Sequence, residues 1–151
     1  KGGNYMFNDE NQPYWGIFYV PTNEKLKLTV DIWCQDSNKN TTINKYGLIN
    51  NWNVSKITDM SGLFQDTNFG IHPFDIIDNW NVENVTNMDS MFKNATLFNG
   101  SIGNWNVDNV INMDNLFNGA IIFNKPIIVG IFTNYLMQPV CSVVRSLLIN
   151  L

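Results

Sequence analysis

Few side chains of this sequence could take part in catalysis. His72 is the single histidine, and it lies between Asp66 and Asp75 in a stretch broken by glycine and proline. Histidine is the usual proton carrier near neutral pH. A Ser-His-Asp arrangement would have to be built around this one imidazole, whichever serine supplied the nucleophile. We therefore interpret His72 as a solvated loop residue and expect no catalytic residue and no enzyme.

Side chains that bind metals are equally sparse. Cys34 and Cys141 lie far apart, and no Cys/His cluster has the spacing of a zinc site. We expect two buried thiols, with a bridge between the two cysteines as the alternative. Oxygen-bearing side chains recur at one repeat position (Asp59, Asn87 and Asn112), and such oxygens suit Ca²⁺, but no calcium-loop spacing accompanies them. We expect no metal and no cofactor.

Composition narrows the class of protein. The chain has 151 residues, 44% apolar and only 15% charged, which is typical of one folded domain. Its 26 asparagines supply much of the polar surface and favour turns. Nine lysines and arginines form no cluster, and the net charge is −4. Nucleic acid is therefore not an expected partner.

The dominant pattern is an internal repeat that begins with Asn-Trp-Asn-Val. Its copies start at residues 51, 79 and 104, so the spacings are 28 and 25 residues. Periods of this length are typical of solenoids, because one unit cannot bury its apolar face alone. Apolar residues recur at fixed offsets in every copy and predict the core: Val54/Val82/Val107, Ile57/Val85/Val110, Met60/Met88/Met113 and Phe64/Phe92/Phe117.

Each unit divides into two limbs. The first limb carries apolar residues every two or three positions, which predicts short strands separated by tight corners. In the second limb, Met88, Met91, Phe92 and Ala95 fall at i, i+3, i+4 and i+7, which predicts a short amphipathic helical turn facing the core. The first unit is three residues longer, around 70–73, and we expect this insertion to form a loop on one face.

Two columns of the repeat are candidate binding positions. An indole is often only partly buried, so the tryptophan column is a candidate surface. The asparagine that follows each tryptophan could bond to its equivalents along the stack as an internal ladder, or form an exposed polar strip for a protein partner. The candidates are Trp52, Trp80, Trp105, Asn53, Asn81 and Asn106.

The segments on either side of the repeats divide the chain further. Residues 1–21 predict an extended aromatic arm, 22–48 an N-terminal cap, 49–127 the three-unit solenoid and 128–151 an apolar C-terminal cap or tail. Residues 127–144 are just long enough to span a membrane, but polar residues and a proline interrupt them, which favours a cap over membrane contact. Candidate assembly contacts at the two ends are Tyr5, Phe7, Tyr14, Trp15, Phe18, Ile131 and Phe132.

The segment 22–34 carries two conflicting patterns. Thr22 suits a helix N-cap, and Leu26, Val30 and Trp33 share one helical face. Leu26, Leu28, Val30 and Ile32 also alternate, as in a strand. The residues alone leave both readings open.

A family resemblance adds to these patterns. Residues 82–95 (Val-Glu-Asn-Val-Thr-Asn-Met-Asp-Ser-Met-Phe-Lys-Asn-Ala) and the Phe-Asn-Lys-Pro-Ile at 123–127 resemble the BspA-type leucine-rich-repeat surface protein repeat, found in mycoplasma lipoproteins and in large viruses of algae. Residues 26–47 are similar to the helical segment before the first repeat of such proteins. The resemblance implies an α/β, right-handed leucine-rich-repeat-like solenoid with a helix over 24–34 and capped ends, and it implies no shared enzymatic activity.

The function expected from the resemblance is non-catalytic. We expect a protein–protein interaction or adhesion module of a surface-displayed repeat protein, located at the cell surface or outside the cell, with a protein partner. The alternative is a structural component of a larger assembly, such as a minor capsid protein of a virion, held by its two ends.

Overall fold

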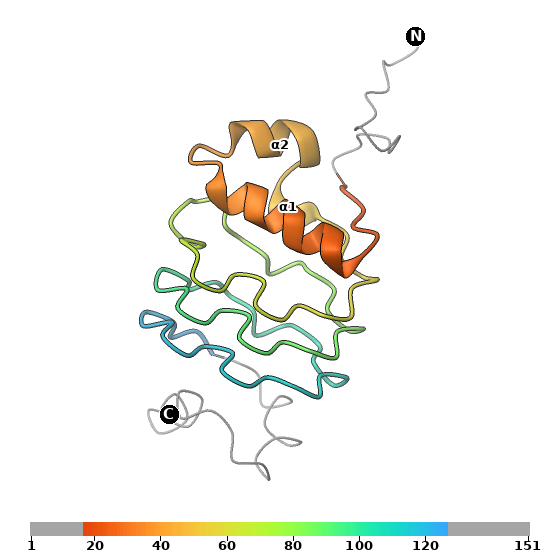
Figure 1. Cartoon of the computed structure of the whole chain (residues 1–151), viewed down its shortest axis with the longest axis vertical. Coiled ribbons are helices and arrows are strands. Elements are labelled where there is room, and N and C mark those ends of the chain that lie inside the picture. Colours follow the sequence, from red (N-terminus) through yellow and green to blue (C-terminus); the bar gives the residue numbers. More distant parts are fainter. Residues whose placement is uncertain (1–16, 127–151) are drawn as a thin grey trace.

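The computed structural model describes residues 17–126. Helices α1 (Asn23–Gln35) and α2 (Asn40–Tyr46) come first, followed by the short 3-10 turn η1 (Ile49–Asn51). The repeats then form coils stacked in sequence order, residues 49–76, 77–101 and 102–126, and α1 lies across the end of the stack at the first coil (Figure 1). The repeat period therefore corresponds to one coil of the stack.

The predicted α/β leucine-rich-repeat solenoid is wrong. Within residues 17–126 there is no β-sheet, and parallel pairing is limited to the isolated bridges Tyr19–Asn53, Asp59–Asn87 and Asn87–Asn112. The α-helices of this part of the chain both precede the coils. The coils consist of turns and irregular backbone, so within the described residues they contain neither the strands nor the α-helices of an α/β repeat.

The second limb of each unit explains the difference. Its apolar side chains are buried as the spacing predicted, but Ser90 and Asn94 have φ angles of 56° each, which interrupts any α-helix. In place of bonds along a helix, alternate N–H groups of this limb donate to carbonyl oxygens of the next coil. The pairs are Met88–Asn112, Ser90–Asp114, Phe92–Leu116 and Asn94–Asn118, at 2.7–2.9 Å between N and O.

The first two coils are joined in the same register. The donating N–H groups and accepting carbonyls are Met60–Asn87, Gly62–Asp89, Phe64–Met91 and Asp66–Lys93, at 2.8–2.9 Å. Backbone polar groups buried without a partner are costly, and these bonds between coils provide partners without forming a regular sheet. We call these backbone bonds between the second limbs the backbone ladder. It has a direction, because each coil donates these N–H groups to the coil that follows it.

Phenylalanine rings form two columns inside the stack. Phe64, Phe92 and Phe117 lie 5.4 and 5.6 Å apart between ring centroids, with interplanar angles of 2° and 3°. A second column of Phe69, Phe98 and Phe123 runs beside it. Rings of this kind bury large apolar areas, so the two columns supply much of the core.

Helix α1 closes the first end of this core. It is a helix, as the family resemblance favoured, and its N-cap Thr22 accepts a hydrogen bond from Lys25 N–H at 3.1 Å. Its buried face presents Leu26, Val30 and Trp33, and the Trp33 ring meets the Trp52 ring edge-on at 5.8 Å between centroids. The strand reading of this segment is wrong because one helical face alone is buried.

Candidate functional site

The tryptophan column lies inside the structure. Trp52, Trp80 and Trp105 are all buried. The indole N–H of Trp80 donates to the carbonyl of Ile49 at 2.8 Å, and that of Trp105 donates to the carbonyl of Ile77 at 3.2 Å. Each acceptor belongs to the preceding coil, so these indoles fasten one coil to the next instead of forming an exposed binding surface.

The asparagine column forms local turns. The side-chain oxygens of Asn53, Asn81 and Asn106 accept the N–H two residues further on, at 3.0–3.1 Å. Such Asx turns mimic a backbone turn. The expected ladder along this column is absent from residues 17–126, while the side chains of Asn81 and Asn106 remain exposed and that of Asn53 is half-buried.

A different asparagine position links the coils. The Asn84 side-chain amide donates to the Ser55 carbonyl at 2.8 Å, and the Asn109 amide donates to the Glu83 carbonyl at 2.7 Å. Asparagine amides therefore do form hydrogen bonds between coils, but they come from Asn84 and Asn109 and not from the predicted column of Asn53, Asn81 and Asn106.

The predicted assembly contacts fall mostly outside the described residues. Tyr5, Phe7, Tyr14, Trp15, Ile131 and Phe132 lie there, as do Cys141 and the predicted C-terminal cap. Phe18 is described and buried, with ring contacts to Tyr46 and Trp52 at 4.8 and 5.5 Å between centroids. This ring is thus part of the first end of the core.

The insertion of the first unit forms a loop that is fixed to the second coil. Gly70 has a φ angle of 107°, and a Cβ atom built on it would lie 2.2 Å from the carbonyl oxygen of Leu97. Both its conformation and this close approach require glycine. The loop therefore starts at a fixed point against its neighbour.

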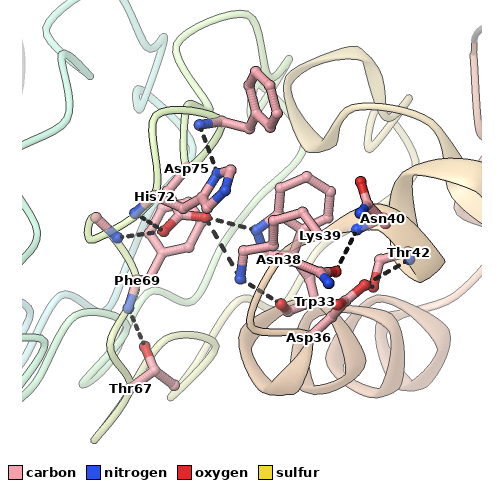
Figure 2. A network of polar contacts seen from close by, with 12 residues as sticks. Trp33, Asp36, Asn38, Lys39, Asn40, Thr42, Thr67, Phe69, His72 and Asp75 are labelled. Carbon is pink, nitrogen blue, oxygen red and sulfur yellow. Dashed lines mark hydrogen bonds and ion pairs between the residues drawn. The ribbon is translucent and has the colours of Figure 1, made fainter.

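A buried carboxylate fixes the remainder of the loop. One oxygen of Asp75 (Oδ2) accepts the N–H groups of Gly70 and His72, each at 3.0 Å, and the other (Oδ1) accepts the Trp33 indole N–H at 2.8 Å. The Lys39 ammonium lies 3.8 Å from Oδ1. Figure 2 shows the carboxylate between the loop on one side and Trp33 and Lys39 on the other.

Lys39 is buried together with its partner. Its residue surface is only 4% exposed, and its ammonium donates to the Trp33 carbonyl at 2.6 Å while lying 5.3 Å from the centre of the Trp33 ring. Its φ angle of 62° at the start of α2 turns the side chain inward. Buried charges need partners, so Lys39 and Asp75 join α1, the turn before α2 and the loop into one unit.

Sequence reasoning missed this ion pair. Lys39 stands in a polar stretch that reads as solvated, and Asp75 stands in the insertion, 36 residues later. One signal was present in the sequence: Asp75 is a charged residue two positions before the buried Ile77, and the repeat pattern does not require a charged residue at that position.

The loop presents apolar side chains on its outer side. Ile71, Phe74 and Ile76 are 67%, 44% and 44% exposed, and all three belong to the segment 70–76, which we name the insertion loop. The His72 ring contacts the Phe74 ring at 5.0 Å between centroids, and its Nδ1 accepts the Phe74 N–H at 3.3 Å. His72 thus supports the loop through its contacts with Phe74.

Other reactive groups in residues 17–126 show no site. Cys34 has a free thiol, and burial raises its pKa to about 11, which makes it a poor nucleophile. Within this part of the chain, no three His, Cys, Asp or Glu side chains are grouped to hold a metal ion, and no helix has both the length and the apolar character to cross a membrane.

Comparison with known proteins identifies the family. The family model described as "Mycoplasma protein of unknown function, DUF285" matches residues 34–129, from the end of α1 through the last described coil. No curated protein and no solved structure matches the chain. Because the match covers more than half of the sequence, the chain belongs to this mycoplasma family.

Proposed function

We propose that this protein is a non-catalytic protein–protein interaction module whose contact surface is the insertion loop. The observation that carries the proposal is the exposure of Ile71, Phe74 and Ile76 on a segment held by the buried Asp75 carboxylate. Exposed apolar groups gathered on one segment are typical of interaction sites. In this loop the backbone is ordered before any partner arrives.

Preorganisation makes such a loop suitable for binding. Association costs free energy when a loop has to become ordered at the interface, and a loop that is already fixed avoids this cost. Aromatic and aliphatic anchors near the centre of an interface supply most of its binding energy. Phe74 and Ile71 would be those anchors, and a protein surface with an apolar pocket would be the partner.

The family resemblance supports a location for this activity. The repeat is similar to that of BspA-type surface proteins, which supports display at the cell surface and adhesion to a protein of another cell. The alternative role, a component of a virion held by the chain ends, relies on residues outside 17–126. The insertion loop has its support within the described residues, so we propose adhesion.

The test compares two double variants on cells. I71S/F74S removes both anchors. I111T/I121T replaces two isoleucines that are more exposed still, and threonine already occupies the equivalent repeat positions Thr86 and Thr96. Fluorescently labelled proteins would be incubated with cultured epithelial cells, with and without prior trypsin treatment of the cells, and bound fluorescence would be measured by flow cytometry.

We expect the wild type to bind the cells, and trypsin treatment of the cells to abolish this binding. The control I111T/I121T should bind as strongly as the wild type. Binding of I71S/F74S should be at least about tenfold weaker, because each anchor contributes over 1 kcal/mol. Equal binding of all three proteins would exclude the insertion loop as the contact surface. Absence of binding by the wild type to any cell line would exclude adhesion.

A further inference from the structure

One turn motif recurs along the described chain, and the insertion loop carries a different form of it. In the coils, a side-chain amide oxygen accepts the N–H two residues further on, at 3.0–3.1 Å. The acceptors include Asn53, Asn81, Asn87, Asn106 and Asn112. In the loop, His72 Nδ1 accepts the Phe74 N–H at 3.3 Å. A ring nitrogen therefore replaces the amide oxygen at this turn.

This ring nitrogen helps to fix the exposed Phe74 side chain within a tight turn. The Asp75 N–H donates to the His72 carbonyl at 2.9 Å, and Pro73 takes the second position of the turn, where its fixed φ angle is favourable. The His72 and Phe74 rings contact each other at 5.0 Å between centroids. A displaced imidazole would therefore change the position of the Phe74 ring as well as release its N–H.

Amide and imidazole acceptors respond differently to acid. The side-chain oxygen of an asparagine accepts hydrogen bonds throughout the range from about pH 5 to 8. Histidine ordinarily gains a proton within this range, and both of its ring nitrogens are then donors. A protonated Nδ1 of His72 would face the Phe74 N–H, donor against donor. The bond to Phe74 can therefore form only with the neutral imidazole.

The charged groups around the loop already have other partners. The Asp75 carboxylate accepts two backbone N–H groups of the loop and pairs with the Lys39 ammonium, and Asp36 at the end of α1 accepts from the first turn of α2 (Figure 2). The second coil packs on the loop through residues 97–98, which carry no charge, and Asp78 follows the loop with an exposed side chain. Among these groups, only the imidazole ordinarily changes its charge between about pH 5 and 8.

We propose that His72 is a positioning residue for the Phe74 anchor and that its protonation weakens binding by the insertion loop in acid. This inference rests on the proposed contact surface. At neutral pH the imidazole holds Phe74 in the turn. In acid the turn loses this bond, and the loop has to become ordered again at the interface, which costs binding free energy. Protonation of histidine is a general means of switching interfaces near pH 5–6.

Amide exchange of the full chain, measured by NMR, tests the switch without a partner. H72N keeps an acceptor that does not titrate, as in the coils, and H72A removes the acceptor. Protection of the Phe74 amide is taken relative to its intrinsic exchange rate at each pH. In the wild type it should be about two- to tenfold lower at about pH 5.5 than at about pH 7.5. Protection should be equal at both pH values in H72N and low at both in H72A.

Equal protection of the wild-type Phe74 amide at the two pH values would overturn the proposal. The same result would follow from an H72N variant that loses protection in acid as the wild type does, because the change would then come from another group.

The cell-binding assay tests the consequence for the contact surface. Binding of the wild type should be about two- to tenfold weaker at about pH 5.5 than at about pH 7.5, and binding of H72N should be equal at both. An equal loss in acid for H72N would overturn the regulation of binding by His72. Absence of wild-type binding at both pH values would contradict the proposed function, and the exchange of the Phe74 amide would still decide whether the imidazole holds the turn.

Discussion

Removal of the Asp75 carboxylate is the most informative perturbation of the insertion loop. In D75A, the Lys39 ammonium would stay buried beside the Trp33 carbonyl without its counter-charge, and three N–H groups would lose their acceptor. The two side chains are only 5% and 1% exposed, so solvent cannot replace the lost charge. Loss of one partner of a buried ion pair costs about 3–5 kcal/mol. We expect a decrease in the free energy of unfolding within that range.

Urea denaturation followed by tryptophan fluorescence measures this decrease. The matched control is D78N, since Asp78 lies three residues away with an exposed side chain, and we expect its change to stay within about 0.5 kcal/mol. The double variant K39M/D75N removes both charges. Its loss of unfolding free energy should be smaller than the sum of the losses in K39M and D75N, by about 0.5–3 kcal/mol.

Two results would refute this reasoning. A loss below about 1 kcal/mol in D75A would show that the carboxylate does not hold the loop against α1. Strict additivity in the K39M/D75N cycle would show that Lys39 and Asp75 do not depend on each other.

Three further predictions concern the stack and its first end. N23A removes the acceptor of two N–H groups at the first coil and should lower the free energy of unfolding by about 1–3 kcal/mol, whereas N44A, on the exposed side of α2, should change it little in the same urea titration. F92A empties the centre of a ring column and should cost about 3–5 kcal/mol, and a cost no larger than that of the exposed F74A would contradict the packing role of the column. The Cys34 thiol has a pKa of about 11 in place of 9.0, so at pH 8 it should carry about 100-fold less thiolate than an ordinary thiol. In a C141S background, labelling of Cys34 by iodoacetamide should therefore be slow at pH 8 and should become faster up to pH 11. Fast labelling at pH 8 would contradict the burial of this thiol.

The repeat register and the residues of the core could be predicted because a fixed spacing reports which side chains share a face. The Val, Met and Phe columns are buried as predicted. Spacing does not report backbone conformation, so the spacing of Met88, Met91, Phe92 and Ala95 indicated a helix where Ser90 in fact has a positive φ angle. The same inner face arises from turns whose N–H groups pair with the next coil.

The partner of a polar side chain was harder to predict. Asparagine at 53, 81 and 106 indicated bonds between coils, but a short amide reaches its own backbone first and forms an Asx turn. The pairing of Lys39 with Asp75 depends on how α1 and α2 pack on the first coil, and no local pattern encodes that packing. The insertion was predicted as a loop, while its apolar outer face became visible only once the buried Asp75 was located.

The direction of the ladder has a consequence for how such a protein can change in length. Most backbone bonds between the described coils use equivalent atoms, and the indoles of Trp80 and Trp105 both reach the isoleucine three residues before the preceding tryptophan. A unit of this kind can be duplicated or deleted as a whole, because the new neighbours present the same donors and acceptors. The first coil lacks this freedom, since Asp75 and Thr58 bond to α1 residues that exist once. Gain or loss of units during evolution should therefore occur after residue 76, and the insertion loop should stay beside α1 whatever the number of coils.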